Sequence, residues 1–192
     1  MERPVEEVTR NGKTLKIFVD EDPQNPREWD NLTKMVCFHK RYDLGDTQTD
    51  YRQEAFESWD ELKAEIIEKE KPLVIKPLYM YDHSGITIST EPFSCQWDSG
   101  QIGWVYITNK TIDVCGTIIK NDETFAQYKE RLGEYLEGEV KEYDQYITGD
   151  VYLFELTDET GKTIDSCGGF YGDDWKTNGI SAYVGEEFLD AL

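Results

Sequence analysis

The chain has 192 residues, of which 40 are acidic and 20 are basic, so its formal net charge at pH 7 is −20. Hydrophobic residues make up only 38% of the chain, but aromatic residues make up 13%, whereas acidic chains that stay disordered carry few aromatics. We therefore expect a folded domain spanning residues 1–192, with residues 1–12 flexible, and we expect no direct binding of nucleic acid, which needs basic stripes.

The first half of the chain predicts strands and two helices. Alternating β-branched residues predict a strand at 13–19. The sequence Asn25-Pro26-Arg27-Glu28 is typical of a helix start and predicts a short helix with Trp29, Leu32 and Val36 on one face. Helical spacing of apolar residues predicts a second helix at 53–69. Residues 73–80 and 86–90 flank a turn and predict a hairpin.

The second half predicts one long helix among further strands. Strands are expected at 103–109 and 113–119, a third helix at 122–146, a hairpin from 151–157 and 162–166, and a short terminal helix at 185–192. Gly133 and Gly138 interrupt the third helix and predict a bend or close packing. Together these elements predict a single α+β domain, with a mainly antiparallel sheet packed with about three helices.

The four cysteines indicate a reduced intracellular protein. Cys37, Cys95, Cys115 and Cys167 form no CxxC pair, which argues against a zinc ribbon or a thioredoxin-like motif. The first seven residues are acidic and contain no apolar signal segment, and no apolar run is long enough to span a membrane. We expect a protein of the bacterial host's cytoplasm that has no membrane partner and whose thiols are structural.

No catalytic group, cofactor or metal site is expected. His83 and Cys95 can meet across a hairpin, whereas Cys37 and His39 lie two apart on a predicted helix and do not face each other. The acidic runs Asp20-Glu21-Asp22 and Asp173-Asp174 do not match an EF-hand loop. The glycine-rich residues 167–172 lack the lysine of a phosphate-binding loop and predict a tight turn with a packed aromatic pair.

Carboxylates of the third predicted helix are the first candidate contact surface. Residues 1–96 carry 20 acidic and 13 basic side chains, while residues 97–192 carry 20 and 7. Carboxylates three or four residues apart on a helix stand about 5–6 Å from each other, which resembles the spacing of phosphates along one nucleic-acid strand. The predicted partner-binding residues are Glu123, Glu130, Glu134, Glu137, Glu142 and Asp144, together with Asp173 and Asp174. Glu139 lies near the edge of the apolar stripe.

Several phrases of the sequence resemble a group of small proteins encoded by phages and mobile elements of gut bacteria. The phrases are PREWDNLTKMVCFH (26–39), RYDLGD (41–46), HSGITIS (83–89), PFSCQWDSGQIGWVYI (92–107) and DSCGGFYGDD (165–174). The group resembles anti-defence proteins, including anti-CRISPR inhibitors of Cas9-type nucleases. The resemblance implies an inhibitor and assigns no residue a role. If these phrases form the contact surface, the alternative partner-binding residues are Trp97, Asp98, Gln101 and Trp104.

The sequence therefore predicts an acidic, phage-encoded inhibitor of a nucleic-acid-targeting defence nuclease. The expected target is a CRISPR–Cas effector such as Cas9 or a restriction enzyme. The inhibitor acts by binding this nuclease, and one form of the hypothesis is that it mimics nucleic acid. One alternative is an enzyme that modifies a small molecule with a site made of His83 and a cysteine or an acidic pair. Another alternative is a protein that sequesters a host factor or a signalling nucleotide.

Overall fold

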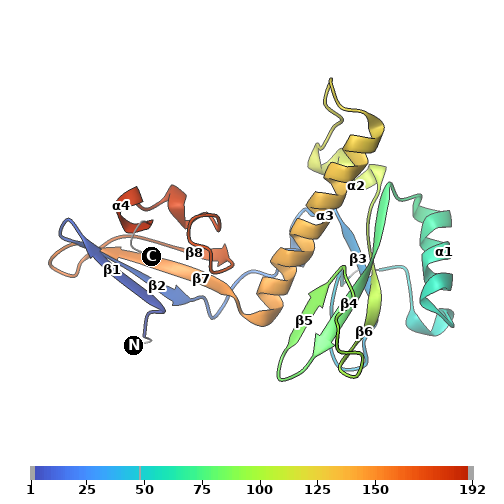
Figure 1. The fold of residues 1–192 in the computed structure, drawn as a ribbon, viewed down its shortest axis with the longest axis horizontal. Helices are drawn as coiled ribbons and strands as arrows, with labels where there is room; N and C mark the ends of the chain where they lie inside the picture. The colour runs from blue at the N-terminus through green and yellow to red at the C-terminus, as the bar shows by residue number, and fades with distance from the viewer. Residues whose placement is uncertain (1–2, 48, 190–192) are drawn as a thin grey trace. The chain divides into compact units, whose positions relative to one another are not determined.

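The chain is an α+β protein whose strands pair in antiparallel fashion (Figure 1). A computed structural model describes residues 3–47 and 49–189. It divides into two compact units, unit 1 (Met1–Asn25 and Gln145–Leu192) and unit 2 (Pro26–Asp144). Each unit has its own four-stranded sheet. The predicted fold class is confirmed, and the expectation of a single domain stays a prediction.

The sheet of unit 1 has the strand order β1-β2-β7-β8. Its strands are β1 (Glu6–Arg10), β2 (Lys13–Val19), β7 (Val151–Thr157) and β8 (Thr163–Tyr171). The predictions for β2 and for the β7–β8 hairpin are confirmed. Strand β1 lies within the segment expected to be flexible, and its pairing with β2 from Glu6 to Arg10 was not predicted. Only Val8 of β1 is buried, so its sequence carries little of the alternation that indicates a strand.

One face of this sheet carries the core of unit 1. The buried side chains come from the strands and from the C-terminal segment that holds η3 (Ile180–Ala182) and α4 (Glu186–Leu189). They are Val8, Leu15, Ile17, Phe154, Leu156, Phe170, Ile180, Val184 and Phe188. A short terminal helix was predicted at 185–192, and α4 confirms it up to residue 189; residues 190–192 lie outside the described residues.

The predicted tight turn at 167–172 is wrong, because residues 167–171 belong to strand β8, which ends at Tyr171. The register of β7 against β8 shifts between Tyr152 and Phe154, so that two glycines stand opposite one residue in a bulge. Gly169 has a φ of +79°, a conformation that glycine adopts without steric cost. Its amide N–H donates to Oδ2 of Asp20 at 3.0 Å, which binds the bulge to the end of β2.

The sheet of unit 2 has the strand order β3-β6-β4-β5. The strands are β3 (Lys34–Cys37), β4 (Val74–Asp82), β5 (Ile86–Ser89) and β6 (Ser99–Ile107). The predicted hairpin is confirmed as β4 and β5. The predicted strand at 103–109 is confirmed up to Ile107, where β6 ends. All pairs are antiparallel.

Helices cover both faces of the unit 2 sheet. Figure 1 shows α1 (Trp59–Glu70) on one side of the sheet and α3 (Phe125–Thr148) on the other. Leu62 and Ile66 of α1 pack against Trp104 and Tyr106 of β6. Because side chains alternate across a strand, Val105 and Ile107 point to the opposite face, and both are fully buried. The apolar stripe of α3 is buried at Tyr128, Leu132, Leu136, Val140 and Tyr143.

The predicted helix after Asn25 is wrong beyond its first turn. The chain forms only the short 3-10 helix η1 (Pro26–Glu28) and then enters strand β3, which holds Val36. Trp29, expected on the buried face of that helix, is 40% exposed. The amide N–H groups of Leu32 and Thr33 donate to the carboxylate of Glu139 on α3 at 2.8 and 3.0 Å. A tertiary contact thus takes the donors that a helix would use internally.

The predicted strand at 113–119 is also wrong, because helix α2 (Asn109–Cys115) occupies its first half. Thr108 caps the helix, and Thr108 and Thr111 form a reciprocal capping box. Gly116 ends the helix in the left-handed conformation with a φ of +69°. The second predicted helix starts later than expected, since residues 53–58 contain only η2 (Gln53–Ala55) and Ser58 caps α1.

The glycines of α3 are not sites of close packing. A Cβ atom added at Gly133 or Gly138 would meet no side chain or neighbouring element within 4 Å. We expect Gly138→Ala to raise the free energy of unfolding by about 0.5–1 kcal/mol, because alanine loses less backbone entropy in a helix. Urea denaturation followed by circular dichroism measures the change. Gly103→Ala is the contrasting control, since its Cβ would overlap the backbone carbonyl of Val36. A loss of stability in Gly138→Ala would contradict the prediction.

Candidate functional site

Several acids of the predicted contact helix hold unit 2 together. Glu123 lies just before α3 and pairs with the guanidinium of Arg131 through contacts of 2.8 and 2.6 Å. This pairing lowers the pKa of Glu123 to about 2. Glu137 forms an ion pair with Lys76 of β4. Asp144 accepts hydrogen bonds from the amide N–H of Ile88 at 2.7 Å and from the Thr87 hydroxyl at 2.8 Å. Glu123, Glu137 and Asp144 therefore have partners within unit 2, which reduces the charge that they can offer to another protein.

A smaller exposed acidic row remains on α3. Glu130 and Glu134 are exposed and form no ion pair within the part of the chain that the structure describes. Glu137, which is 50% exposed, follows on the same helix face because positions three and four apart are neighbours. Asp173 and Asp174 are exposed in unit 1, and hydrogen bonds from Thr177 and Lys176 lower the pKa of Asp174. Of the acids predicted on this helix, Glu130, Glu134 and Glu137 thus form one accessible row, which we call the acidic row.

Glu142 is partly buried, as Glu123 and Asp144 are, but its pKa is raised. Burial first, and then the nearby carboxylate of Glu139, raise the pKa of Glu142 above its usual range. A raised folded pKa means that the folded protein binds more protons, so stability falls as the pH rises from about 4.5 through the folded pKa. We expect Glu142→Gln to raise the denaturation midpoint at pH 7 and to leave it unchanged at about pH 3.5. Equal midpoints for the two proteins at pH 7 would contradict this.

Glu139 is the structurally central acid that the sequence analysis missed as a site. Its carboxylate accepts from two backbone amides and lies 3.6 Å from the guanidinium of Arg27. Arg27, whose side chain is 2% exposed, also forms an ion pair with Asp46 at 2.7 Å and donates to the Thr33 carbonyl at 2.9 Å. The acid at the edge of the helix stripe therefore secures the N-terminal part of unit 2, and it is not a contact surface.

The alternative contact residues lie around a groove in unit 2. Trp97, in the loop between β5 and β6, is 95% exposed, which is extreme for an indole. We call the hollow beside it, of about 300 Å³, the Trp97 groove. It is lined by His39, Arg41, Met80, Asp82, Trp97, Asp98, Ser99, Gly100, Gln101 and Ile102. The structure thus brings together Trp97, Asp98 and Gln101, three of the four residues predicted.

Trp104, the fourth alternative residue, is not part of this surface. It is only 5% exposed, its indole N–H donates to the backbone carbonyl of Trp59 at 2.9 Å, and the ammonium of Lys63 lies 4.7 Å from its ring centroid. The prediction of Trp104 as a contact residue is wrong, since it belongs to the core. Sequence position explains the difference, because Trp104 lies within strand β6 and Trp97 lies in the loop before it.

Two charged residues that line the Trp97 groove, Arg41 and Asp82, were not predicted as contact residues. Arg41 forms an ion pair with Asp82, and its guanidinium lies 5.4 Å from the ring centroid of Tyr42. The Tyr42 hydroxyl donates to the other oxygen of Asp82 at 3.4 Å. Arg41 begins the phrase RYDLGD that carries part of the family resemblance, so the sequence held a signal for it. The groove therefore presents one basic and two acidic side chains beside the exposed indole.

The candidate cysteine–histidine pair is close in space but arranged in the wrong order for nucleophilic activation. Oδ2 of Asp98 lies 3.4 Å from Nδ1 of His83 and 3.6 Å from Sγ of Cys95. An activated cysteine gives its proton to an imidazole that a carboxylate orients. Here the same carboxylate oxygen contacts both the thiol and the imidazole, so the imidazole is not placed to take the proton of the thiol. The arrangement fixes the loop that carries Trp97.

The other candidate chemistry is structural. Burial raises the pKa of the Cys37 thiol to about 12, which disfavours the reactive thiolate. Cys37 lies on strand β3, and the helix predicted for it and His39 does not form. In residues 3–47 and 49–189, no three His, Cys, Asp or Glu side chains are arranged to hold a metal ion. None of the described helices has the length and apolar character to cross a bilayer.

The chain was compared with models of protein families, with curated proteins and with solved structures. None of these comparisons found a match. The resemblance of the sequence phrases to phage-encoded anti-defence proteins therefore stays a prediction.

Proposed function

We propose that this protein is an acidic inhibitor that binds a bacterial nucleic-acid-targeting defence nuclease, of the CRISPR–Cas or restriction type, at its basic cleft. The observation that carries the proposal is the 95% exposure of Trp97 beside a groove that contains Asp82 and Asp98. An isolated exposed indole at the rim of a hollow is typical of a residue that anchors a protein interface.

The charge of the chain supports a basic partner. A net charge of −20 exceeds the about 2–8 that keeps a small domain soluble. Such a surface accelerates association with a cleft that neutralises phosphates, and the effect falls with salt. Nucleic-acid mimicry in the narrow sense has weaker support, because Glu123, Glu137 and Asp144 have partners within unit 2. We therefore assign the anchor to the Trp97 groove and the steering to the acidic row Glu130, Glu134 and Glu137.

A cleavage assay tests the proposal directly. A panel of purified CRISPR–Cas effectors and restriction enzymes is mixed with DNA and increasing amounts of this protein. We expect one nuclease to lose cleavage at about equimolar protein, and its affinity to fall at least tenfold between about 50 mM and about 500 mM NaCl. The inhibitor Glu130→Gln/Glu134→Gln serves as the charge control and should associate more slowly. Unchanged cleavage across the panel, or equal affinity at both salt concentrations, would overturn the proposal.

A further inference from the structure

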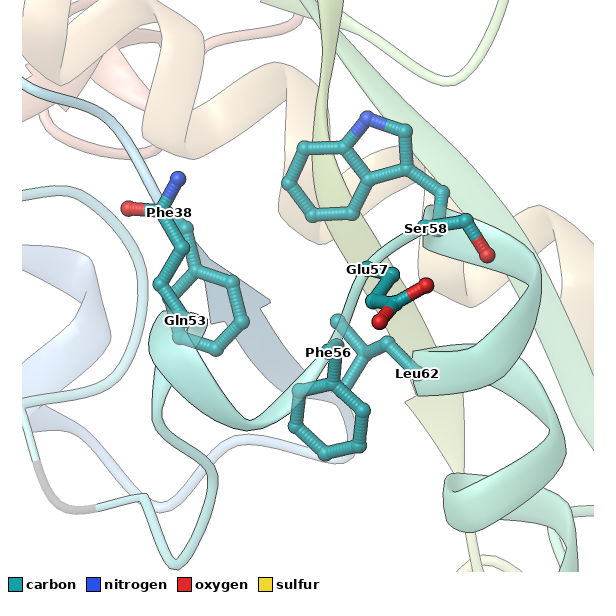
Figure 2. A pocket seen from close by; sticks show the side chains of 7 residues that line it. Phe38, Gln53, Phe56, Glu57, Ser58 and Leu62 are labelled. Atoms are coloured by element: carbon teal, nitrogen blue, oxygen red, sulfur yellow. The ribbon is translucent and has the colours of Figure 1, made fainter.

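A second hollow of unit 2 has aromatic walls and an acidic rim. It has a volume of about 420 Å³ and lies where the loop after η2 leads into α1. We call it the aromatic pocket. Its lining residues are Phe38, Gln53, Phe56, Glu57, Ser58, Trp59 and Leu62. Figure 2 shows Glu57 and the rings of Phe38 and Phe56 around the same space. None of these residues lines the Trp97 groove.

The aromatic rings of the pocket are held in place by the core of unit 2. The rings of Phe38 and Trp59 are nearly parallel, with an interplanar angle of 16° and centroids 6.2 Å apart. Phe56 packs against Tyr51 at 6.2 Å, and Leu62 beneath the pocket is 1% exposed. The indole N–H of Trp104 donates to the Trp59 carbonyl, which fixes the first turn of α1. The walls are therefore formed before any ligand binds.

The rim of the pocket carries acceptor groups and negative charge. The Glu57 carboxylate forms no ion pair within the described part of the chain, and Gln53 adds a carboxamide oxygen. Glu54, Asp60 and Glu61 are exposed nearby in the sequence, and Arg52 is the single basic residue between 52 and 61. The nearest lysine of α1, Lys63, lies over the ring of Trp104 and is not a lining residue. The pocket therefore disfavours anions and favours a group that brings positive charge.

Among organic cations, a guanidinium group fits this combination best. It is planar, it stacks on aromatic faces, and its five N–H donors match a carboxylate together with a carboxamide oxygen. A quaternary ammonium has no donor for these acceptors, and a lysine ammonium is a compact, strongly hydrated charge without a stacking face. We propose that the aromatic pocket receives an arginine side chain of the partner protein. The inference that the arginine belongs to a partner protein rests on the proposed function, because arginine is common in clefts that bind nucleic acid.

The test uses the whole protein and capped amino acids, so it needs no partner. The probe is N-acetyl-arginine methylamide, and its neutral isostere is N-acetyl-citrulline methylamide. The indole resonance of Trp59 reports binding in two-dimensional NMR. We expect saturable shifts with a millimolar dissociation constant for the arginine probe, and at least tenfold weaker binding for the citrulline probe. Equal binding of the two probes, or no shift of Trp59 up to about 20 mM arginine probe, would overturn the assignment.

Matched variants locate the effect at the pocket. Glu57→Gln should weaken binding of the arginine probe about fivefold, and Phe56→Leu should weaken it by a similar factor while keeping apolar volume. Glu54→Gln is the control, because Glu54 is a neighbouring exposed acid that does not line the pocket, and it should change the affinity less than twofold. Since Glu57 is exposed, we expect Glu57→Gln to keep the fold. Equal effects of Glu57→Gln and Glu54→Gln would contradict the proposal.

Two further comparisons identify the source of the guanidinium and separate the two proposals. Free L-arginine should bind no more tightly than the capped probe, and tenfold tighter binding of free arginine would overturn the side-chain assignment in favour of a small molecule. If the arginine probe binds and no nuclease is inhibited, the proposed function fails and the pocket chemistry stands. If a nuclease is inhibited and the arginine probe does not bind, only the pocket assignment fails.

Discussion

Replacing Arg27 by methionine should lower the free energy of unfolding by about 3–5 kcal/mol. The guanidinium is 2% exposed and lies between the carboxylates of Asp46 and Glu139. Methionine fills much of the volume but leaves both carboxylates without their counter-charge in a partly buried site. Urea denaturation followed by tryptophan fluorescence and by circular dichroism measures the loss.

Arg41→Met is the matched control for the Arg27 prediction. Arg41 also forms an ion pair with an aspartate, Asp82, but its side chain is 67% exposed. An exposed ion pair contributes at most about 1 kcal/mol, because water and salt screen it. If Arg27→Met does not fold, Glu139→Gln at the same network gives a measurable loss. Similar losses for Arg27→Met and Arg41→Met would show that burial of the network does not determine its contribution.

The same network explains why sequence reasoning failed between Asn25 and Cys37. The local signals for a helix start at Pro26 and Glu28 are real, and one short 3-10 turn does form there. The continuation depends on Glu139, more than a hundred residues later, whose carboxylate takes the amide N–H groups of Leu32 and Thr33. No local pattern reveals a partner at that separation, so propensity is overridden by a tertiary contact.

The strands were predictable where one face is buried and the turns are tight. Both hairpins, β4–β5 and β7–β8, follow from alternation and turn residues. Helix α2 was missed although its signals were local: Thr108 and Thr111 form the cap, and Gly116 provides the left-handed end. A fuller use of capping patterns would have identified α2, whereas β1, with only Val8 buried, has too weak a pattern.

The sequence predicted which types of residue form the candidate site, but it did not predict which of them are exposed to solvent. Trp97 and Trp104 are seven positions apart in one phrase, and although the predicted strand at 103–109 contained Trp104 alone, membership of a strand does not by itself show that a side chain is buried. The acids of α3 present the same difficulty, because Glu134 is free in solvent while Glu139 anchors another segment. The sequence predicted an acidic helix. Which of its carboxylates are exposed and which bind other segments of the chain depends on residues that are distant in the sequence.

Replacing Trp97 by alanine should weaken binding of the target nuclease at least about thirtyfold while changing the free energy of unfolding by less than about 0.5 kcal/mol. The stability is unaffected because an indole that is 95% exposed contributes almost no buried area to the fold. The binding loss is large because an anchoring indole is desolvated only in the complex. Inhibition titrations and urea denaturation measure the two quantities on the same protein.

Two comparisons decide whether the anchor or the acidic row makes the contact. Phe125→Ala removes another exposed aromatic side chain, 57% exposed and outside the Trp97 groove, and should leave inhibition unchanged. Glu130→Gln/Glu134→Gln should slow association and reduce the salt dependence, with a smaller effect on dissociation than Trp97→Ala has, because steering charges act mainly before contact. If Trp97→Ala inhibits normally and the double glutamate variant does not, the contact surface is the row on α3, because the charge alone then determines binding.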